Sequence, residues 1–396
     1  MTPLFRILAA LVFGTTALAQ GKPETLRLGT WNLEFLGAKG NFRNNLPPRD
    51  DADFAAIGKK VVELGVAVLA VQEICGDAPL VKVTAAAGPT WRFVLGTSGG
   101  WDDGKTSQQI GFLYDTSKVQ LLFVDELTQL PREIEGTPIY HRVPLTAGFR
   151  SVATGFDFRA TTVHLKAGRK AQDQQKRRYE ATHLHDWLQS LQGRGDEDHD
   201  LVLLGDFNST YGDDPEKLLE AGGGLQYLEL SPRRPTILHF DDPIDQIVAG
   251  KDFVELQRGT FAVHGDLGDL SRDAWRKTYS DHLPVTVDLV ARGDDDPEAT
   301  FSRVTAAPAA AQAAQPAAQP AAMRATTRRA GWPPQVGQRV RLRYGLDGDL
   351  RHERAAEGAL ITMPMGAAAQ ELWVVIQTNE GVIGVPFARV LSVEVL

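Results

Sequence analysis

The stretch Leu203-Leu204-Gly205-Asp206-Phe207-Asn208 decides how the rest of the chain is interpreted. Its apolar residues predict a buried strand. At the end of this strand stand an acid, Asp206, and an amide, Asn208, two positions apart. Because side chains alternate between the faces of a strand, Asp206 and Asn208 point the same way while Phe207 turns into the core. A carboxylate beside an amide at the end of a strand suits the orientation of a water for attack on phosphorus. Both residue types also favour ordinary turns, so the hexapeptide alone is only suggestive.

Other predicted strands end in the same kinds of polar side chain, namely Thr25–Asn32, Val66–Glu73 and Thr161–His164. Pro243–Ile247 places an acid within an apolar run, and Tyr279–Pro284 supplies an acid and an imidazole together. They contribute Asn32, Glu73, His164, Asp245, Asp281 and His282. Strand ends that face one edge of a sheet can converge on one pocket, so we expect these side chains to share a site.

With Gly205–Asn208, these motifs stand in the order found in the endonuclease/exonuclease/phosphatase superfamily of metal-dependent phosphoesterases, which the sequence resembles from about Leu26 to Leu289. The motifs are Trp31-Asn32, Gln72-Glu73, His164-Leu165, Gly205–Asn208, Ile244-Asp245 and Ser280–His282. The resemblance implies an α/β (α+β) fold of four layers, two packed β-sheets flanked by helices, with the site at one edge. The sequence agrees, since apolar strand-like runs alternate with amphipathic helical ones.

Residue chemistry suggests a metal site, and the resemblance implies the same one. Glu73 offers hard oxygen ligands suited to Mg²⁺ or Mn²⁺, with Ca²⁺ as a further candidate. Asn32 would support the same ion or a phosphate oxygen, and Asp281 would complete the metal environment through water. Such an ion neutralises charge on a phosphoryl group and on the leaving oxygen.

Proton transfer falls to the two histidines. We expect His282 to be the general base, because imidazole titrates near neutral pH and Asp245 can hold the ring and stabilise its charged form. His164 lies opposite as a phosphate ligand or proton donor, and which histidine gives and which takes a proton stays open. Asp206 and Asn208 would position the water and bond the phosphate.

Basic residues follow His164 at the start of an expected helix whose apolar positions have helical spacing. Those apolar positions are Ala181, Leu184, Leu188 and Leu191. Lys166 and Arg169 could contact backbone phosphates, and a solvated helix surface is an equally good interpretation. Arg142 is a third candidate, because His141-Arg142-Val143-Pro144 resembles the Arg-x-Pro segment of the deoxyribonuclease-like branch, where the Arg approaches the phosphate.

The N-terminus has the features of an export signal over residues 1–19. Arg6 precedes the apolar stretch Ile7–Phe13, and Ala17-Leu18-Ala19 forms a small-x-small cleavage pattern. This arrangement is typical of a signal peptide and predicts a periplasmic or extracellular enzyme. The stretch is too short for a stable membrane span.

We expect three further segments: a catalytic domain over 20–300, a linker over 301–335 rich in Ala, Pro and Gln, and a small β-barrel-like (SH3-like) module over 336–396. The linker has too few large apolar residues to pack. The module alternates apolar and polar residues, as in Trp373–Gln377, and Thr378–Gly381 predicts a tight hairpin. Its partner is not identifiable from the sequence.

The charge of the chain is uneven. The net charge is −8, and residues after 300 carry ten Arg against seven acids, so about −11 falls on the rest. An acidic body is unusual for a nucleic-acid enzyme, although bound divalent cations offset local charge. We interpret Asp196–Asp200 and Asp294–Asp296 as solvated acidic loops that could bind Ca²⁺ only loosely, because they lack the ligand spacing of a dedicated loop. The single cysteine, Cys75, excludes an intrachain disulfide.

Our first functional interpretation is an exported, monomeric, non-sequence-specific endonuclease that cleaves nucleic acid, DNA before RNA, without stable membrane insertion. His164 at its strand end is similar to the pancreatic-type deoxyribonuclease and sphingomyelinase branches. The alternative is a secreted sphingomyelinase, or another phospholipid or inositol-phosphate phosphoesterase, although no long apolar loop stands out. A non-catalytic binding protein on the same fold is the weakest alternative, since every expected catalytic residue is present.

Overall fold

Two β-sheets form the central layers of the protein, in a computed structural model that describes most of the chain up to residue 303. The described residues are 24–37, 49–99, 108–134, 136–210, 213–228, 233–292, 294–296 and 299–303, followed by five strands after residue 338. The export signal expected at residues 1–19 and the linker from residue 304 onward lie outside the described residues.

The first sheet has six strands in the order β13-β14-β1-β2-β4-β3. Their bounds are β1 Glu24–Leu36, β2 Val68–Ile74, β3 Trp91–Leu95, β4 Gln109–Asp115, β13 Leu256–Val263 and β14 Val285–Ala291. β1 and β2 run parallel, which places Asn32 beside Gln72, and the other pairs in this sheet are antiparallel. The polar ends of β1 and β2 therefore lie at one edge of the sheet.

The second sheet also has six strands, in the order β11-β12-β10-β9-β8-β5. Their bounds are β5 Val119–Glu126, β8 Leu145–Ser151, β9 Asp157–His164, β10 Leu201–Asp206, β11 Leu225–Leu228 and β12 Asp245–Gly250. β10 runs parallel to β9 and antiparallel to β12, with Asp206 opposite His164 on one side and Asp245 on the other. The pairing register alone thus places three of the expected site residues in a row.

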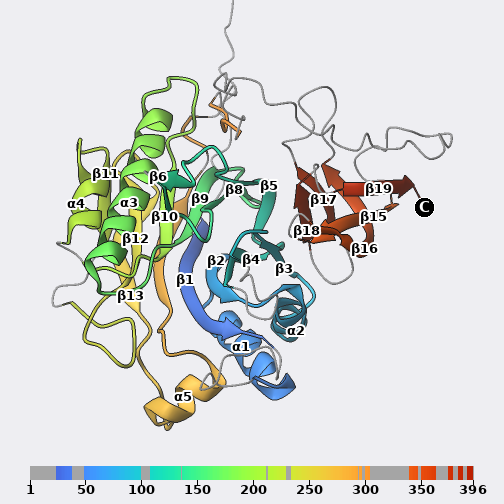
Figure 1. The fold of residues 1–396 in the computed structure, drawn as a ribbon, viewed down its shortest axis with the longest axis horizontal. Helices are drawn as coiled ribbons and strands as arrows, with labels where there is room; N and C mark the ends of the chain where they lie inside the picture. Colours follow the sequence, from blue (N-terminus) through green and yellow to red (C-terminus); the bar gives the residue numbers. More distant parts are fainter. Residues whose placement is uncertain are drawn as a thin grey trace, which may run out of the picture.

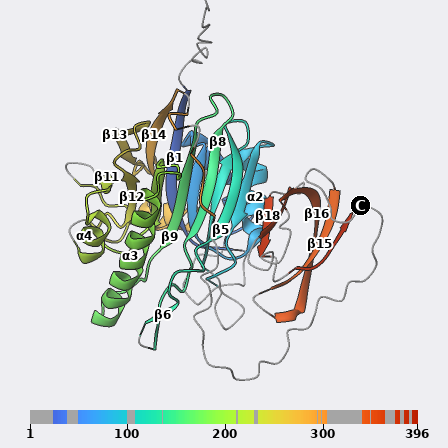
Figure 2. The same cartoon turned by 90° about the horizontal axis from the view of Figure 1, so that it is seen from above.

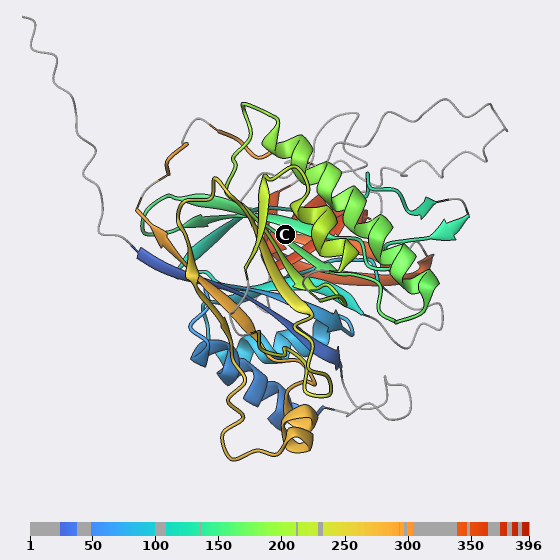
Figure 3. The ribbon, with the colours of Figure 1, turned by 90° about the vertical axis from the view of Figure 1, so that its left-hand side faces the viewer.

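Helices cover the outer face of each sheet, so the molecule has four layers (Figures 1 and 2). The helices are α1 Asp51–Glu63, α2 Asp77–Ala87, α3 Ala171–Gln192, α4 Asp214–Glu220 and α5 Arg272–Thr278. In Figure 3, α3 and α4 lie on one side of the two sheets, and α1, α2 and α5 lie on the other. The α/β sandwich expected from the sequence is confirmed.

Three apolar clusters correspond to the three interfaces between these layers. One lies between the sheets and includes Phe112, Phe149 and Phe158. Another packs α1 and α2 onto the first sheet, and the third packs α3 and α4 onto the second. The predicted apolar face of α3 is buried in the third cluster, where burial of apolar area is the main stabilising term.

Three of the five expected runs are strands with small shifts of their ends. Thr25–Asn32 falls within β1, Val66–Glu73 overlaps β2, and Thr161–His164 is the end of β9. In the other two, Asp245 is the first residue of β12, and Tyr279–Pro284 forms the connection between α5 and β14 instead of a strand. None of the helices in the described part of the chain combines the length and the apolar character needed to cross a bilayer.

The C-terminal module is a five-stranded antiparallel sheet in the order β18-β17-β16-β15-β19. The strands are β15 Arg339–Leu346, β16 Asp349–Thr362, β17 Trp373–Gln377, β18 Val382–Pro386 and β19 Val390–Val395. The antiparallel pairing of β17 with β18 matches the predicted hairpin, whose turn lies outside the described residues. The SH3-like assignment stays a prediction.

The packed part of the catalytic domain continues past the expected boundary at residue 300. Arg303 donates two hydrogen bonds to Asp125, of 2.6 Å and 2.7 Å, and Phe301 packs on Phe123 with ring centroids 5.3 Å apart. We therefore place the start of the linker after residue 303.

A small separate ribbon, in which β6 Glu133–Ile134 pairs with β7 Thr137–Pro138, completes the described elements.

Gly205 allows β10 to lie close to β9, which yields the first prediction. A Cβ at this position would lie 2.0 Å from the carbonyl oxygen of Val163, and the φ angle of +152° disfavours other residues. Gly205→Ala should lower the free energy of unfolding by about 3 kcal/mol or more, measured by urea denaturation. Gly195→Ala is the matched control, because no atom lies within 4 Å of its added Cβ. Equal stability of the two variants would contradict the inference that β9 and β10 can lie this close together only with glycine at position 205.

Candidate active site

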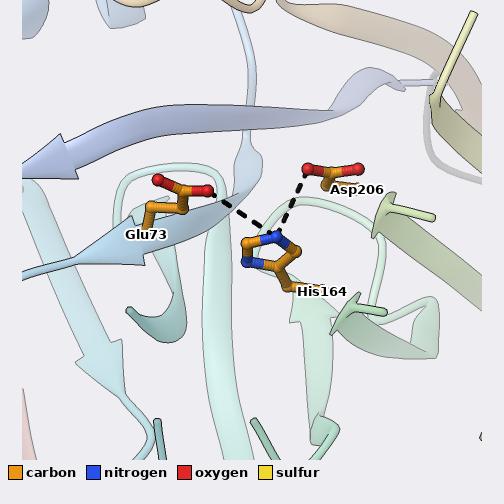
Figure 4. Close-up of side chains that lie close together, drawn as sticks. All are labelled: Glu73, His164 and Asp206. Atoms are coloured by element: carbon orange, nitrogen blue, oxygen red, sulfur yellow. Dashed lines mark ion pairs between the residues drawn. The ribbon is translucent and has the colours of Figure 1, made fainter. Parts of the chain in front are cut away.

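The polar residues at the strand ends of both sheets meet at one edge of the sandwich. Figure 4 shows Glu73 from β2, His164 from β9 and Asp206 from β10 pointing toward one another. His164 Nε2 lies 3.4 Å from Asp206 Oδ2 and 3.7 Å from Glu73 Oε1. One ligand atom of each residue lies within 4.8 Å of the other two, so the three side chains could share one metal ion.

Asn32 joins the two acids of this group. Its Nδ2 donates hydrogen bonds to Asp206 Oδ2 at 2.9 Å and to Glu73 Oε1 at 3.3 Å. Its Oδ1 accepts from the backbone N–H of Glu34 at 3.0 Å. In the structure the amide therefore bridges two carboxylates, and its role as an oxygen ligand or phosphate contact stays a prediction.

A second group lies on the other side of Asp206. His282 Nδ1 and Asp245 Oδ2 are 2.8 Å apart, so the ring donates its Nδ1 proton and turns Nε2 toward the site. That Nε2 lies 3.9 Å from Asp206 Oδ2 and 3.8 Å from Asp281 Oδ1. Asp206 is thus flanked by the Nε2 atoms of both histidines.

Buried hydrogen bonds hold the His282 segment in place. Ser280 Oγ donates to the carbonyl of Asn32 at 2.6 Å and accepts from the N–H of His282 at 3.0 Å. The indole Nε1 of Trp31 donates to the carbonyl of His282 at 3.0 Å. Because these partners lie on β1 of the first sheet, the position of His282 depends on that sheet while its Asp245 partner belongs to the second.

Asn208 turns back over the end of β10. It has a positive φ of 51°, its N–H donates to Asp206 Oδ1 at 2.8 Å, and its Nδ2 donates to the carbonyl of Leu165 at 3.1 Å. These bonds fix the orientation of the Asp206 carboxylate. Its Oδ1 accepts the hydrogen bond from Asn208, and its Oδ2 faces the centre of the site. The expected proximity of Asp206 and Asn208 is thus present.

The two histidines are driven toward opposite protonation states. Burial lowers the pKa of His164 well below its usual value, and repulsion by Arg142 and His282 adds to this effect. Burial also opposes the charged form of His282, but attraction by Asp245, Asp206 and Asp281 outweighs it and raises the pKa of His282 well above its usual value. These directions favour a neutral His164 and a charged His282 when no cation is bound.

The acids of the site are buried together, which is costly without a cation. Burial and the neighbouring charges of Asp281 and Asp206 raise the pKa of Glu73 to about 7, although His282 and Asn32 oppose the rise. Burial, together with Asp245, also raises the pKa of Asp206 to about 6. The carboxylates outnumber the one imidazolium in a region where an uncompensated charge is expensive.

A hard divalent cation fits this arrangement of donors. Asp281 Oδ1 and Asp245 Oδ1 are buried and have no hydrogen-bond partner among the described residues. Glu73 and Asp206 offer carboxylate oxygens and His164 offers a nitrogen within one ion's reach. Glu73 is the ligand expected from the sequence, whereas the structure adds Asp206 and His164 to the candidates and keeps Asp281 nearby.

Arg142 is buried behind the site. Its Nε donates to the carbonyl of His164 at 3.0 Å, and its Nη2 donates to the carbonyl of Leu165 at 3.0 Å. Its Nη1 donates to Gln108 Oε1 at 2.7 Å. These contacts make Arg142 a positioning residue for the end of β9, which differs from the phosphate contact that the sequence suggested.

Lys166 and Arg169 pair with acids other than those of the site. Lys166 Nζ is 3.0 Å from Asp173 Oδ1. Arg169 is 78% exposed, lies 3.6 Å from Asp242 and stacks over the ring of Phe240 at 4.8 Å. The structure does not bring these two residues into the cluster, and their contact with a substrate phosphate stays a prediction.

Sequence reasoning missed a buried charge network around Glu34. Glu34 accepts a hydrogen bond of 2.7 Å from Arg276 Nε and one of 3.1 Å from the backbone N–H of Asp281. Arg49 Nη1 donates to the Glu34 carbonyl at 2.8 Å. No local signal could have linked these residues, because Glu34 and Arg276 are 242 positions apart. The network holds Asp281 beside His282.

The Asp245–His282 pair yields the second prediction. Asp245→Asn should lower the pKa of the His282 ring, because the amide carries no charge to stabilise the imidazolium. The change is measured by an NMR pH titration of the ring in the presence of a chelator. Asp241→Asn, at an exposed position on the same segment, should leave it unchanged. An unaltered His282 titration in Asp245→Asn would show that Asp245 does not set the charge of this ring.

Several solved structures resemble the chain in fold. No curated protein sequence is significantly similar to the chain. Among solved structures, an endonuclease/exonuclease/phosphatase family protein from Bacteroides thetaiotaomicron is 21% identical, with a TM-score of 0.47, over 68% of this chain and 98% of that one. A mannosyl-6-phosphatase of the same organism is 19% identical, with a TM-score of 0.46, over 66% and 98%. ANGEL2, a 2',3'-cyclic phosphatase, is 13% identical, with a TM-score of 0.50, over 70% and 99%.

The family resemblance inferred from the motifs is confirmed by a direct match. The model of the Endonuclease/Exonuclease/phosphatase family matches residues 29–282, a range that contains every member of the site from Asn32 to His282. The chain therefore belongs to this family and is a metal-dependent phosphoester hydrolase.

Proposed function

We propose that the protein is a secreted phosphodiesterase that cleaves nucleic acid without sequence specificity, by in-line attack of an activated water. The observation that carries this proposal is the position of Asp206 between two imidazoles, with His164 Nε2 at 3.4 Å and His282 Nε2 at 3.9 Å from its Oδ2. In-line displacement at phosphorus needs a proton acceptor near the water and a proton donor near the leaving oxygen. Two histidines on either side of one carboxylate meet that need.

The residues divide the work as follows. Asp206, held by Asn208 and Asn32, orients the attacking water, and the two histidines move the protons. A divalent ion held by Glu73, with Mg²⁺ as our first choice and Mn²⁺ or Ca²⁺ as others, neutralises charge that develops on the phosphoryl oxygens. Asp245 keeps the ring of His282 in one orientation through the 2.8 Å bond at Nδ1.

Different protonation states of the two histidines suit one donor and one acceptor. In the absence of a cation, His282 favours the protonated form and His164 the neutral form. The role of His282 as the base stays a prediction. A cation beside Glu73 would weaken the attraction of the acids for the imidazolium of His282, so the charge of the ion decides which histidine donates the proton and which accepts it.

A nucleic-acid substrate is supported by an aromatic and a basic side chain near the site. Phe240 is 49% exposed, and Arg169 lies over its ring at 4.8 Å. The loop that carries Phe240 also contacts the site, since the N–H of Leu238 donates to the carbonyl of Asp281 at 2.7 Å. An exposed ring with a neighbouring guanidinium can stack a base and contact a phosphate. DNA is our first choice, with RNA as the next.

A secreted phosphoesterase for sphingomyelin, other phospholipids or inositol phosphates is the alternative, because the same phosphoryl chemistry serves those substrates. The large apolar side chains that are exposed in the described residues are dispersed over separate elements. Entry into a lipid surface needs several apolar side chains together, so this distribution favours the nucleic-acid proposal. A non-catalytic binding protein is disfavoured by the assembled site.

Export, domain organisation and oligomeric state are also proposals. Residues 1–19 have the pattern of a signal peptide, so we propose that the mature enzyme works in the periplasm or outside the cell as a monomer. The module after residue 338 would then be an accessory that tethers the enzyme to a partner not yet identified. The site residues described above all precede residue 283.

The third prediction tests the reaction. The protein should nick supercoiled plasmid in the presence of Mg²⁺ or Mn²⁺, and a chelator should abolish nicking. His164→Ala, His282→Ala and Asp206→Ala should each lower the rate by about 10³-fold or more, because each removes a proton carrier or the group that orients the water. His183→Ala, on α3 and outside the site, should retain the full rate.

A parallel assay with sphingomyelin distinguishes the two substrate classes. The protein could hydrolyse sphingomyelin and leave plasmid intact, and His164→Ala could lower the rate of that hydrolysis. This result would replace the nuclease proposal by the phospholipid proposal. Loss of neither activity in the His164 and Asp206 variants would contradict the site itself.

The fourth prediction concerns the C-terminal module. A chain that ends at Arg303 should keep its nicking rate within about twofold, because β18 of the module contacts β3, a strand that carries none of the site residues. A chain that ends at residue 298 should unfold at a lower temperature, since it loses the Arg303–Asp125 and Phe301–Phe123 contacts. Loss of activity in the longer form would show that the module is part of the enzyme.

A further inference from the structure

A second group of acids lies at the opposite end of the strands from the active site. Asp198 and Asp200 precede β10, Glu255 precedes β13, and Asp294–Asp296 follow β14. The six residues of β10 separate Asp200 from Asp206, which corresponds to about 20 Å along an extended strand. The sequence suggested separate solvated loops, whereas the fold gathers them into one cluster.

The members of this cluster are close together, and three of the six are buried. One oxygen each of Asp198, Asp200 and Asp296 lies within 4.8 Å of the other two, and the same holds for Asp200, Glu255 and Asp295. Asp198 is 1% exposed, Asp200 3% and Glu255 8%. Asp200 therefore belongs to both sets of three and lies at the centre of the cluster.

Three carboxylate oxygens in the cluster lack a hydrogen-bond partner among the described residues, one each of Asp200, Glu255 and Asp296. Asp200 Oδ2 and Glu255 Oε2 are buried, and neither receives a hydrogen bond from the described residues. A buried carboxylate oxygen without a donor loses its hydration and gains nothing in return, so such atoms point to a missing partner. Both atoms belong to residues whose oxygens face the other acids of the cluster.

The neighbouring arginines are engaged with other acids. Arg159 pairs with Glu197 at 2.8 Å, Arg194 pairs with Asp196 at 3.2 Å, and Arg150 pairs with Asp157. Within the described residues, no Lys or Arg forms an ion pair with Asp198, Asp200 or Glu255. Burial and the surrounding carboxylates raise the pKa of Asp200 to about 10, and burial, together with Asp157 and Asp296, raises that of Asp198 to about 9. The cluster needs protons or a cation to be stable at neutral pH.

We propose that this cluster is a structural Ca²⁺ site centred on Asp200. The ligand set consists of carboxylate oxygens alone, which a hard cation prefers and which excludes ions that need nitrogen or sulfur. Oxygens bound to one Ca²⁺ at about 2.4 Å lie at most about 4.8 Å apart, and the oxygens of each set of three lie within 4.8 Å of one another. Mg²⁺ demands a near-ideal octahedron and usually keeps several waters, whereas Ca²⁺ accepts several carboxylates in a flexible geometry, so Ca²⁺ fits this group better.

The ion would fasten the end of the catalytic domain to both sheets. Asp200 leads into β10 of the second sheet, while Glu255 leads into β13 and Asp294–Asp296 leave β14 of the first. The chain that follows is already paired to the same loop, because the N–H of Asp198 donates to the carbonyl of Thr300 at 3.1 Å and the N–H of Thr300 donates to the carbonyl of Asp196 at 3.0 Å. This site therefore acts on stability, and its role does not depend on the proposed substrate.

The fifth prediction tests this site by thermal unfolding of the full chain after removal of metal ions. Ca²⁺ at up to about 10 mM should raise the melting temperature of the wild-type protein by about 5 °C, in a saturable manner. Asp200→Asn and Glu255→Gln should each abolish most of that shift. Asp200→Asn should melt no lower than the wild-type protein without Ca²⁺, because the amide removes repulsion at the centre of the cluster.

Two controls separate this site from other acids. Asp196→Asn changes an exposed acid of the same loop that is paired with Arg194, and it should keep the full Ca²⁺ shift. Glu73→Gln removes the carboxylate of the active-site metal candidate and should also keep it. Absence of a Ca²⁺ shift in the wild-type protein, or an equal shift in Asp200→Asn and Glu255→Gln, would overturn the proposal. A shift lost only in Glu73→Gln would assign the Ca²⁺ effect to the active site.

Discussion

The hydrogen bond of 2.9 Å from Asn32 Nδ2 to Asp206 Oδ2 is the contact on which the site depends, because it joins the two sheets where their polar strand ends meet. Farther into the sandwich, Gln72 Nε2 donates to Thr162 Oγ1 at 3.0 Å and to Thr30 Oγ1 at 3.1 Å. These buried polar contacts set the relative position of β1 and β2 against β9 and β10. Glu73 and His164, which extend from those same strands, are placed as a consequence. Apolar packing alone would allow the sheets to slide, whereas paired buried polar groups favour one alignment.

Charge is the second constraint on the site. Four carboxylates converge on two imidazoles, and burial raises the cost of each negative charge. The imidazolium of His282, held by Asp245, offsets part of this unfavourable free energy. The N–H donors of Asn32 and Asn208 offset a further part by hydrogen bonding to the carboxylates. A divalent cation provides the remainder, which accounts for the metal dependence of the family. The same excess of negative charge that disfavours the unliganded site gives it affinity for an ion.

The two acidic clusters show how similar residues serve different purposes. At the active site, histidines accompany the acids, so protons can be moved as well as charges neutralised. Around Asp200 the group is made of carboxylates alone, and their only evident use is to bind a cation that ties strands together. Both clusters lie at strand ends, because turns there free side chains from the sheet and carry acids from distant segments to one place. Catalysis and stability are thereby assigned to opposite ends of the same strands.

The sequence by itself determined most of the strands, the four-layer sandwich and the members of the site from Asn32 to His282, because polar residues in or beside apolar runs are local signals. It also identified the family, since the order of the motifs is a property of the chain. Only the tertiary structure decided that Asp206 lies between His164 and His282, that Arg142 supports β9 from behind, and that Glu34 holds Asp281. The acids at 198–200, 255 and 294–296 look like separate loops in the sequence, and they become one buried cluster only when both sheets are assembled. The alternation of apolar and polar residues predicts which face of its own strand a side chain lies on. The distances between site residues and the protonation of their side chains depend on which strands become neighbours, and only long-range pairing determines those neighbours.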